Sequence, residues 1–317
     1  MNSYQEQLTG VITALVTPFD TESQVDFEAF DTLLDQQLAA GVTGLLPVGT
    51  TGEAATLTEE ERSNIIGRTV KAAAGKAFVL AGTGSNDTAK AVAWTRKAED
   101  LGVDGCLVVT PYYNKPTQQG LIDYYSRVAD CTTVPIILYS VPGRCGVEIA
   151  PETAAQLRER HHNIIGIKEA GGSVERVTEL SEACGGDFII HCGDDALTLP
   201  FLATGAIGVT SVVSNVAPEL MVELIQAWQQ RDLNRALQLH RRVHQLAAAL
   251  FIEGNPVPVK AALAMQGCSG NTVRSPLAPL APNNAQYVAD TLSAYQAYKS
   301  ATCAEIQPTH YTVGQLS

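Results

Sequence analysis

The strongest constraint on the fold of this chain is a repeat of short, β-branched, apolar runs, each followed by a longer segment of helical period. The runs begin between 19 and 33 residues apart. They are apolar along almost their whole length, as expected of parallel strands that are buried on both faces of a sheet. The eight runs occupy residues 11–16, 44–48, 77–81, 105–109, 135–139, 163–168, 188–192 and 207–212.

The segments between these runs carry the signals of helix ends. Thr58 with Glu61 fits a capping box at a helix start, and Pro151 suits a first helical turn. Apolar residues recur with helical spacing over 27–38. Glycines that suit the C-terminal ends of three helices stand at Gly41, Gly75 and Gly102.

Eight strand–helix units within about 220 residues match the size of a (β/α)₈ barrel, or TIM barrel. A doubly wound open sheet is the alternative, but it favours a glycine-rich turn after the first strand, and residues 17–19 contain no glycine. After Arg231 only helical patterns follow. We therefore predict a barrel over residues 8–231, a C-terminal helical region over 232–299 that packs with it as one unit, and a tail over 300–317.

Composition excludes several classes of function. The 317-residue chain carries a net charge of −12, which argues against nucleic acid or an anionic membrane surface as a partner. Its longest uninterrupted apolar run, residues 246–252, is too short to cross a bilayer. The first residues contain neither a basic nor an apolar signal region. These features predict a cytoplasmic protein that binds neither nucleic acid nor membranes.

Cysteine and histidine spacing predicts neither a disulfide framework nor a metal site. The seven cysteines are scattered and form no C-x-x-C pair. His240 and His244 have the spacing of a metal-binding helix, but no glutamate follows His240. We interpret the two histidines as the polar face of a helix.

In a barrel of this kind the functional side chains come from the C-terminal ends of the strands and the loops that follow. Lys168 ends the sixth predicted strand, and alternation would place Ile164, Gly166 and Lys168 on one face. A lysine held among apolar walls loses its proton more readily and becomes a nucleophile toward carbonyl carbon. The alternative is a lysine that reaches solvent or pairs with Glu169.

Three further groups stand at the same predicted end of the barrel. Residues 49–53 (GTTGE) precede a helix and either cradle a carboxylate or phosphate or form a plain turn. Tyr139 ends the fifth strand, where a phenol relays protons or packs. Arg144 follows in the next loop, where it binds a carboxylate or is solvated.

Seven motifs, in this order along the chain, resemble those of the pyruvate-dependent class I aldolase family that includes N-acetylneuraminate lyase. Within that family they are most similar to the 4-hydroxy-tetrahydrodipicolinate (dihydrodipicolinate) synthases. The resemblance covers about residues 10–298, barrel and helical region alike. The motifs are GTTGEAATL at 49–57, TPYYN at 110–114, LY at 138–139, PGR at 142–144, IIGIKE at 164–169, GDD at 193–195 and NPVPVK at 255–260.

The resemblance implies the catalytic residues. Lys168 forms an imine with pyruvate. Tyr139, Thr51 and Tyr113 match the family's proton relay, with Tyr113 supplied across a dimer interface. Because the protonated imine is itself the electron sink, the resemblance implies neither a metal nor an organic cofactor. It also implies a homo-oligomer, with a tetramer built from dimers.

The resemblance also implies how the substrates are held. Thr50 and Thr51 match positions that bind the pyruvate carboxylate. Arg144 matches the arginine that receives the carboxylate of aspartate semialdehyde, while Gly193 and Thr210 align with positions that line the pocket. The implied reaction is the condensation of pyruvate with L-aspartate 4-semialdehyde to 4-hydroxy-tetrahydrodipicolinate, in lysine and diaminopimelate biosynthesis.

Two other functions compete with this one. The first is the same imine chemistry on another aldehyde, as in aldolases of 2-keto-3-deoxy sugar acids. Those relatives usually lack an arginine at the position of Arg144. The second is a catalytically idle barrel that binds a ligand, against which the intact set of Lys168, Tyr139 and Thr51 argues.

One departure from the family concerns regulation. Members inhibited by lysine use histidines shortly after the GTTGE loop and a glutamate on the third helix. Here those positions read Glu59, Arg62 and Lys90, although Asn86 and Tyr112 agree with the family. Lys90 would repel the ammonium groups of the ligand. We therefore predict weak or absent inhibition by lysine.

Overall fold

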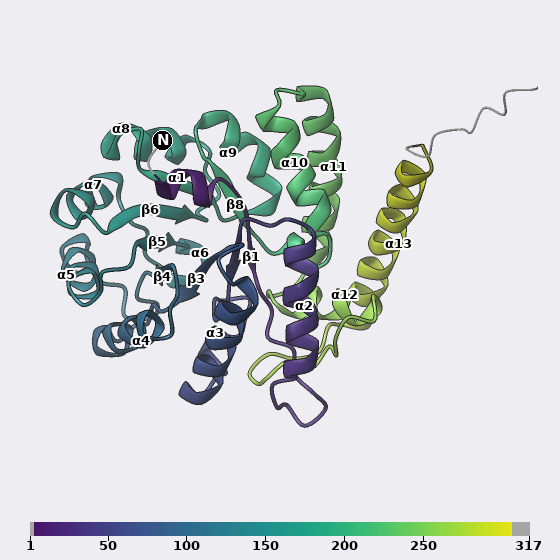
Figure 1. The fold of residues 1–317 in the computed structure, drawn as a ribbon, viewed down its shortest axis with the longest axis horizontal. Coiled ribbons are helices and arrows are strands. Elements are labelled where there is room, and N and C mark those ends of the chain that lie inside the picture. Colours follow the sequence, from purple (N-terminus) through teal and green to yellow (C-terminus); the bar gives the residue numbers. More distant parts are fainter. Residues whose placement is uncertain (1–2, 306–317) are drawn as a thin grey trace, which may run out of the picture.

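The computed structural model describes residues 3–305, and its strands form a closed barrel in which all eight neighbouring pairs are parallel (Figure 1). The order around the barrel is the order along the chain. The predicted (β/α)₈ barrel is therefore confirmed, and the open sheet is excluded. The strands are β1 (Gly10–Ala14), β2 (Gly44–Leu46), β3 (Phe78–Gly82), β4 (Gly105–Val109), β5 (Ile136–Ser140), β6 (Ile164–Glu169), β7 (Ile189–Cys192) and β8 (Gly208–Ser211).

Helices surround the barrel and cover the outer face of its strands (Figure 1). The predicted capping box at Thr58 and Glu61 is confirmed, and Pro151 does begin a helix. The three predicted glycines all have positive φ just beyond a helix, a conformation that glycine adopts without strain. The helices are α2 (Phe27–Ala39), α3 (Glu59–Ala73), α4 (Thr88–Asp100), α5 (Gln118–Ala129), α7 (Pro151–Arg160), α8 (Glu175–Cys184), α9 (Thr198–Thr204) and α10 (Pro218–Gln229).

Two short helices were not predicted. Helix α1 (Ser3–Leu8) precedes the first strand, and Leu8 is buried with the side chains inside the barrel. Helix α6 (Pro142–Cys145) follows β5 directly and carries Arg144. Helices of six and four residues contain too few side chains to show a hydrophobic period, so the sequence pattern could not reveal either.

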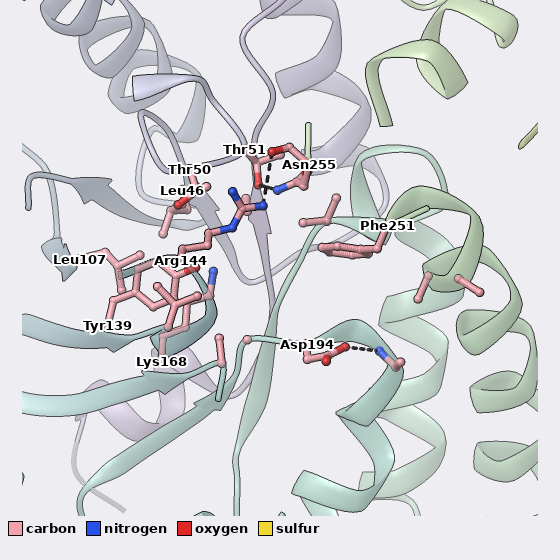
Figure 2. Close-up of a pocket in the computed structure, with 18 of the residues that line it drawn as sticks. Leu46, Thr50, Thr51, Leu107, Tyr139, Arg144, Lys168, Asp194, Phe251 and Asn255 are labelled. Carbon is pink, nitrogen blue, oxygen red and sulfur yellow. Dashed lines mark hydrogen bonds between the residues drawn. The ribbon is translucent and has the colours of Figure 1, made fainter. Parts of the chain in front are cut away.

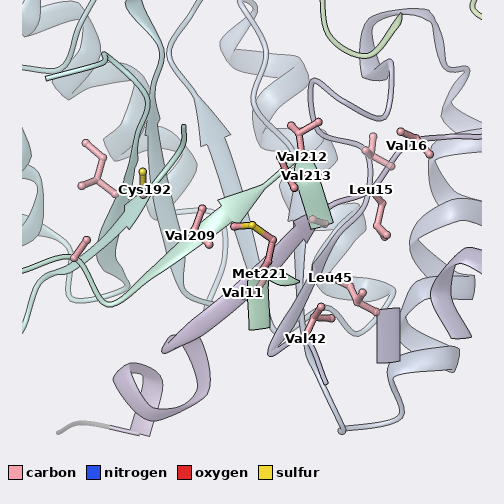
Figure 3. Packing of buried hydrophobic residues seen from close by; sticks show 14 of the residues in the cluster. Val11, Leu15, Val16, Val42, Leu45, Cys192, Val209, Val212, Val213 and Met221 are labelled. Carbon is pink, nitrogen blue, oxygen red and sulfur yellow. The ribbon is translucent and has the colours of Figure 1, made fainter. Parts of the chain in front are cut away.

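The barrel has an inner and an outer apolar layer, because successive side chains of a strand point to opposite faces. The inner cluster includes Ile12, Leu46 and Ile137. The much larger outer cluster packs the strands against the surrounding helices. Figure 3 shows part of it, with Met221 of α10 beside Val11 of β1.

Strand β6 breaks the simple alternation that the sequence predicts. Ile136 pairs with Ile164, but Ile137 pairs with Gly166, so Ile165 is an extra residue in β6. Such a bulge turns the side chains before it to the other face. Ile164 therefore belongs to the outer cluster, while Ile165 packs against the inner one. The prediction that Ile164 shares a face with Lys168 is wrong for this reason.

The C-terminal helices pack beside the exits of the last two strands. Helix α11 (Leu233–Leu250) lies along α10 and contacts η2 (Asp195–Leu197) and η3 (Val213–Asn215), the short 3₁₀ helices that follow β7 and β8 (Figure 1). Helices α12 (Val257–Met265) and α13 (Pro282–Glu305) complete the region. The helical region therefore reaches the end of the barrel where function was predicted.

The expected tail does not begin at residue 300, because α13 continues to Glu305. Alternation of alanine with polar residues gave no clear period there, yet alanine has the highest helix propensity of all residues. The rest of the predicted tail, residues 306–317, lies outside the described residues. Among residues 3–305 no helix is both long and apolar enough to span a membrane.

Candidate active site

A cavity of about 360 Å³ opens at the C-terminal ends of the strands (Figure 2). Its walls are mostly apolar, with Leu46, Leu107 and Phe251 among them. Six of the predicted site residues line it, namely Thr50, Thr51, Tyr139, Arg144, Lys168 and Gly193. A largely apolar cavity with a few converging polar groups is the usual form of a small-molecule site.

Lys168 lies inside the barrel on β6 and is only 5% exposed. Its Nζ is 4.4 Å from the centre of the Tyr139 ring, and these two residues are paired in register on β5 and β6. Within residues 3–305 no hydrogen bond or ion pair holds this amine. The amine faces the cavity, where it is accessible to a bound molecule.

Glu169, the alternative partner of Lys168, points to the opposite side of the strand. Its carboxylate accepts hydrogen bonds from Arg176 at 3.1 Å and from the backbone of Gly171 at 2.7 Å. Complete burial raises the pKa of Glu169, an effect that Arg176 opposes. Both alternatives for Lys168, contact with bulk solvent and pairing with Glu169, are thereby excluded.

Tyr139 is the closest aromatic neighbour of the lysine. Its side chain is buried at the cavity wall, and its hydroxyl bonds to no other group within the described range. A buried phenol normally finds a hydrogen-bond partner. The Tyr139 hydroxyl is therefore available to a molecule bound beside Lys168.

The loop after β2 presents Thr50 and Thr51 to the cavity (Figure 2). Glu53 closes the loop in a left-handed backbone conformation, with φ of 54°. Its carboxylate accepts hydrogen bonds from Nζ of Lys260 at 2.7 Å and from the backbone nitrogen of Arg274 at 2.9 Å. Burial lowers the pKa of Lys260, and the Glu53 carboxylate opposes that effect. Polar groups from the C-terminal region thus fix the end of the loop.

Arg144 enters the cavity from α6, at the exit of β5 (Figure 2). The helix begins at Pro142 and ends at Cys145, and the next residue, Gly146, has a φ of 70°. The guanidinium donates one long hydrogen bond, of 3.4 Å, to the backbone oxygen of Asn255. No carboxylate of the described chain pairs with it, so its remaining donors are available to a ligand.

Gly193, after β7, supports the lysine from the side. A Cβ at this position would lie 3.0 Å from Cε of Lys168 and 2.7 Å from Cβ of Ala170. These distances are shorter than normal carbon contacts. Glycine at this position therefore leaves room for Ala170 as well as for the lysine side chain.

Thr210 does not stand on the cavity wall, contrary to what the resemblance implies. It is buried on β8, and Val212, two residues later, lines the cavity instead. The Thr210 hydroxyl lies 3.3 Å from Nδ1 of His191, whose Nε2 lies 2.7 Å from the carbonyl oxygen of Leu8. Burial lowers the pKa of His191 to about 4, so the ring is neutral and fills the barrel interior below the cavity.

Tyr113 lies away from the cavity of its own chain. Its side chain is 91% exposed, and its backbone has a φ of 74°. The structure thus does not bring Tyr113 to Lys168 within one chain, and its proposed role requires a second copy.

A second cavity, of about 640 Å³, adjoins the first and shares Thr50, Tyr139 and Arg144 with it. Arg62, Asn86, Lys90 and Tyr112, four of the five positions considered for lysine regulation, line this cavity, whereas Glu59 does not. The Arg62 guanidinium stacks 3.7 Å from the centre of the Trp94 ring, and burial lowers its pKa to about 10.

Sequence reasoning assigned no role in a site to the three residues with polar or aromatic side chains that the C-terminal region contributes to the cavity. These are His244 and Phe251, on or next to α11, and Asn255, before α12. The only signal for Asn255 was the NPVPVK motif at 255–260, which carried the resemblance without a function. Among residues 3–305 no group of three or more His, Cys, Asp or Glu side chains is placed to hold a metal ion.

Comparisons with known proteins agree with this geometry. The model of the dihydrodipicolinate synthetase family matches residues 7–295. The 4-hydroxy-tetrahydrodipicolinate synthase of Geobacter metallireducens is 44% identical over 287 residues, which cover 90% of this chain and 98% of that one. The synthase of Thermodesulfovibrio yellowstonii is 46% identical, with coverage of 89% and 97%.

Solved structures give the same result. The 4-hydroxy-tetrahydrodipicolinate synthase of Methylacidiphilum fumariolicum SolV superposes with a TM-score of 0.91 at 46% identity, covering 93% of this chain and 98% of that one. A dihydrodipicolinate synthase from Aquifex aeolicus superposes with a TM-score of 0.89 at 43% identity, covering 91% and 98%. The similarity therefore includes both the barrel and the C-terminal helices.

Proposed function

Because the chain belongs to the dihydrodipicolinate synthetase family, we infer that it is a carbon–carbon lyase that condenses pyruvate with L-aspartate 4-semialdehyde. The product is 4-hydroxy-tetrahydrodipicolinate, on the route to diaminopimelate and lysine. The observation that carries this inference is the buried amine of Lys168, which has no acidic partner among residues 3–305 and faces a cavity that Tyr139 and Arg144 also line.

We propose that Lys168 is the nucleophile. Its neutral amine attacks the ketone carbon of pyruvate, a C–N bond forms, and the ketone oxygen leaves as water. The resulting imine carries a proton on nitrogen, so it withdraws electrons from the neighbouring methyl group. A base then removes a methyl proton and leaves an enamine. The protonated imine is the electron sink, so the chemistry requires neither a metal nor an organic cofactor.

The proton transfers are assigned to hydroxyl groups. The enamine carbon attacks the aldehyde carbon of aspartate semialdehyde, and the aldehyde oxygen takes up a proton. We propose that Tyr139 delivers and removes these protons through a relay with Thr51 and with Tyr113 of a partner subunit. The amino group of the former semialdehyde finally attacks the imine carbon. The bond to Lys168 breaks, and the amine is regenerated as the ring closes.

Both substrates carry carboxylates, whereas the chain has a net charge of −12. Local hydrogen-bond donors must therefore bind the substrate carboxylates against the negative electrostatic field of the whole chain. We propose that Thr50 and Thr51 bind the pyruvate carboxylate and that Arg144, at the cavity mouth, binds that of aspartate semialdehyde. Gly193 contributes by leaving space for Lys168.

We further propose that the protein acts in the cytoplasm as a homo-oligomer, a tetramer built from dimers. The exposed ring of Tyr113 supports a dimer in which this residue completes the site of the partner. Thr210 has no contact with the cavity, so we propose no substrate contact for it and assign it to the support of His191.

Substrate choice is tested by replacing Arg144. In Arg144→Leu we expect kcat/KM for aspartate semialdehyde to fall by about 10²-fold, because a desolvated carboxylate loses its charged partner. Trapping of pyruvate on Lys168 should persist, since Arg144 acts on the second substrate. Steady-state kinetics and borohydride trapping measure the two effects separately.

A control and an aldehyde panel complete this test. Arg241→Leu removes an exposed arginine that lines neither cavity and should leave both readouts unchanged. In the wild-type protein, aspartate semialdehyde should exceed glyceraldehyde by a wide margin. Equal use of the two aldehydes would contradict the synthase function and support a sugar-acid aldolase.

We also propose that lysine inhibits this enzyme weakly or not at all. Lys90 and the buried Arg62 place two positive charges on the walls of the second cavity, and both repel the ammonium groups of lysine. Turnover should be unchanged when millimolar lysine is added. Lys90→Glu should increase sensitivity to lysine, and strong inhibition of the wild-type protein at sub-millimolar lysine would refute the proposal.

A further inference from the structure

Asn255 connects the two groups that are proposed to bind the substrate carboxylates. It lies between α11 and α12, is 7% exposed, and lines both cavities, of which Figure 2 shows the first. Its side-chain nitrogen donates to Oγ1 of Thr51 at 3.0 Å, and its backbone oxygen accepts from Arg144 at 3.4 Å. One residue of the C-terminal helical region thus contacts both of them.

The hydrogen bond from Asn255 determines where the Thr51 hydroxyl can donate its own hydrogen. A threonine hydroxyl has one hydrogen to donate and two lone pairs to accept. Because the amide nitrogen of Asn255 donates to Oγ1, the hydroxyl hydrogen of Thr51 must point elsewhere. Thr51 lines the cavity, so that hydrogen is available to an anionic ligand.

The rest of the Asn255 side chain is not satisfied by the protein. Its Oδ1 is buried and has no hydrogen-bond partner within the described range. Buried polar atoms in folded proteins are normally paired, and exceptions concentrate at functional sites. A residue that served only to close the packing of this region would be better replaced by an apolar side chain.

The C-terminal region also holds the end of the loop that carries Thr51. Lys260 is 0% exposed and pairs with Glu53 at 2.7 Å, and the backbone of Arg274 donates to the same carboxylate. The loop over 49–53 is therefore held at Thr51 by a hydrogen bond from Asn255 and at its end, Glu53, by an ion pair with Lys260. With the end of the loop fixed in this way, the Asn255 amide supplies the hydrogen bond that orients the Thr51 hydroxyl within the described residues.

We propose that Asn255 is a positioning residue that makes Thr51 a hydrogen-bond donor toward the pyruvate carboxylate while it holds Arg144 at the cavity mouth. This proposal rests on the proposed function and adds to it a role for the C-terminal helical region. The segment at 255–260 then has a function in the reaction. Asn255 acts on Thr51 and Arg144, and Lys260 holds the end of the loop over 49–53.

The variant Asn255→Asp tests this role because it reverses the hydrogen bond with little change in shape. An ionised carboxylate accepts the hydroxyl hydrogen of Thr51, so Thr51 no longer donates to pyruvate. We expect kcat/KM for pyruvate to fall by about 10²-fold near pH 8. A protonated carboxyl donates to Oγ1 and restores the native direction. The ratio of variant to wild-type activity should therefore rise as the pH falls through the carboxyl pKa, which burial raises.

Other titratable groups also line the two cavities, and they are the same in Asn255→Asp and in the wild-type protein. They are Glu53, Arg62, Lys90, Tyr112, Tyr139, Arg144, Cys145, Lys168, Asp194 and His244. Division by the wild-type profile removes their shared effect on the rate. Asn163→Asp is the matched control, because Asn163 is 8% exposed and donates to the backbone oxygens of Ala129 and Thr132 outside the cavity. Its activity ratio should not change with pH.

Asn255→Leu separates the positioning of Thr51 from the packing of the region, since leucine fills the space of asparagine but makes no hydrogen bond. It should be impaired at every pH, with a flat ratio, and combination with Thr51→Val should add little further loss. A pH-independent ratio for Asn255→Asp, or full activity of either variant, would overturn the proposal. Absence of pyruvate trapping and turnover in the wild-type protein would instead overturn the proposed function, so the two failures are distinct.

Discussion

Lys168→Met should fold normally and lose synthase turnover by roughly 10⁴-fold or more, as expected when a covalent nucleophile is removed. Methionine keeps the length and apolar stem of lysine but has no amine. The Lys168 amine forms no ion pair or hydrogen bond within residues 3–305, and its contact with the Tyr139 ring can be replaced by a contact of the methionine sulfur with the same ring. Thermal unfolding of the variant should therefore occur at the wild-type temperature or higher. The two measurements are steady-state turnover and circular dichroism.

Lys260→Met is the matched contrast. Lys260, on α12, is the other buried lysine among the described residues, but it pairs with Glu53 at 2.7 Å. Its removal leaves an uncompensated buried carboxylate, which destabilises a protein by about 3 kcal/mol or more. The two variants should thus separate a functional lysine from a structural one. A large loss of stability in Lys168→Met, with turnover retained, would reverse the assignment.

Tyr139→Phe should reduce kcat by about 10² to 10³-fold, because it removes a proton-transferring hydroxyl and leaves the ring in place. The ring contacts Lys168 and packs with the inner cluster, so phenylalanine should preserve the shape of the cavity. KM for pyruvate should change much less, since the carboxylate is assigned to Thr50 and Thr51. Wild-type kcat in this variant would contradict a relay through Tyr139.

The relay also predicts cooperation between subunits. Tyr113→Phe and Lys168→Met should each be impaired alone. After subunit exchange, a mixed dimer contains one site with an intact Lys168 and an intact Tyr113 from its partner. Activity should therefore return when the two variants are mixed. No recovery on mixing would contradict a role for Tyr113 across the interface.

The barrel was predictable because its strands are buried on both faces. Continuous β-branched runs mark such strands clearly, and the run at 105–109 coincides with β4 (Gly105–Val109). The face of each side chain was less predictable. Alternation failed in β6, where Ile165 is an extra residue, because a bulge depends on the pairing with β5 and leaves no mark in its own sequence.

Lys168 and Tyr139 could be predicted because both end strands whose C-terminal ends must meet in a barrel. Thr210 illustrates the limit of that reasoning. It is near the end of β8, but the depth of a side chain in the barrel depends on the stagger between strands. The structure consequently places Thr210 one layer below the cavity, against His191.

Asn255 could not be assigned from sequence because its role depends on long-range contacts. It lies 204 residues from Thr51 and 111 residues from Arg144 along the chain. No periodicity or local motif records such a contact. The length of helix α13 was predicted too short for a different reason. Its last residues, up to Glu305, show no strong apolar stripe in the sequence.

The formation of an imine between pyruvate and Lys168 is the central claim, and it can be measured directly. The protein is incubated with pyruvate, reduced with borohydride, digested and mapped by mass spectrometry. We expect one reduced pyruvate on the peptide that contains Lys168, no adduct on Lys260 or any other lysine, and no adduct in Lys168→Met. An unmodified Lys168, or an adduct on a different lysine, would contradict the claim.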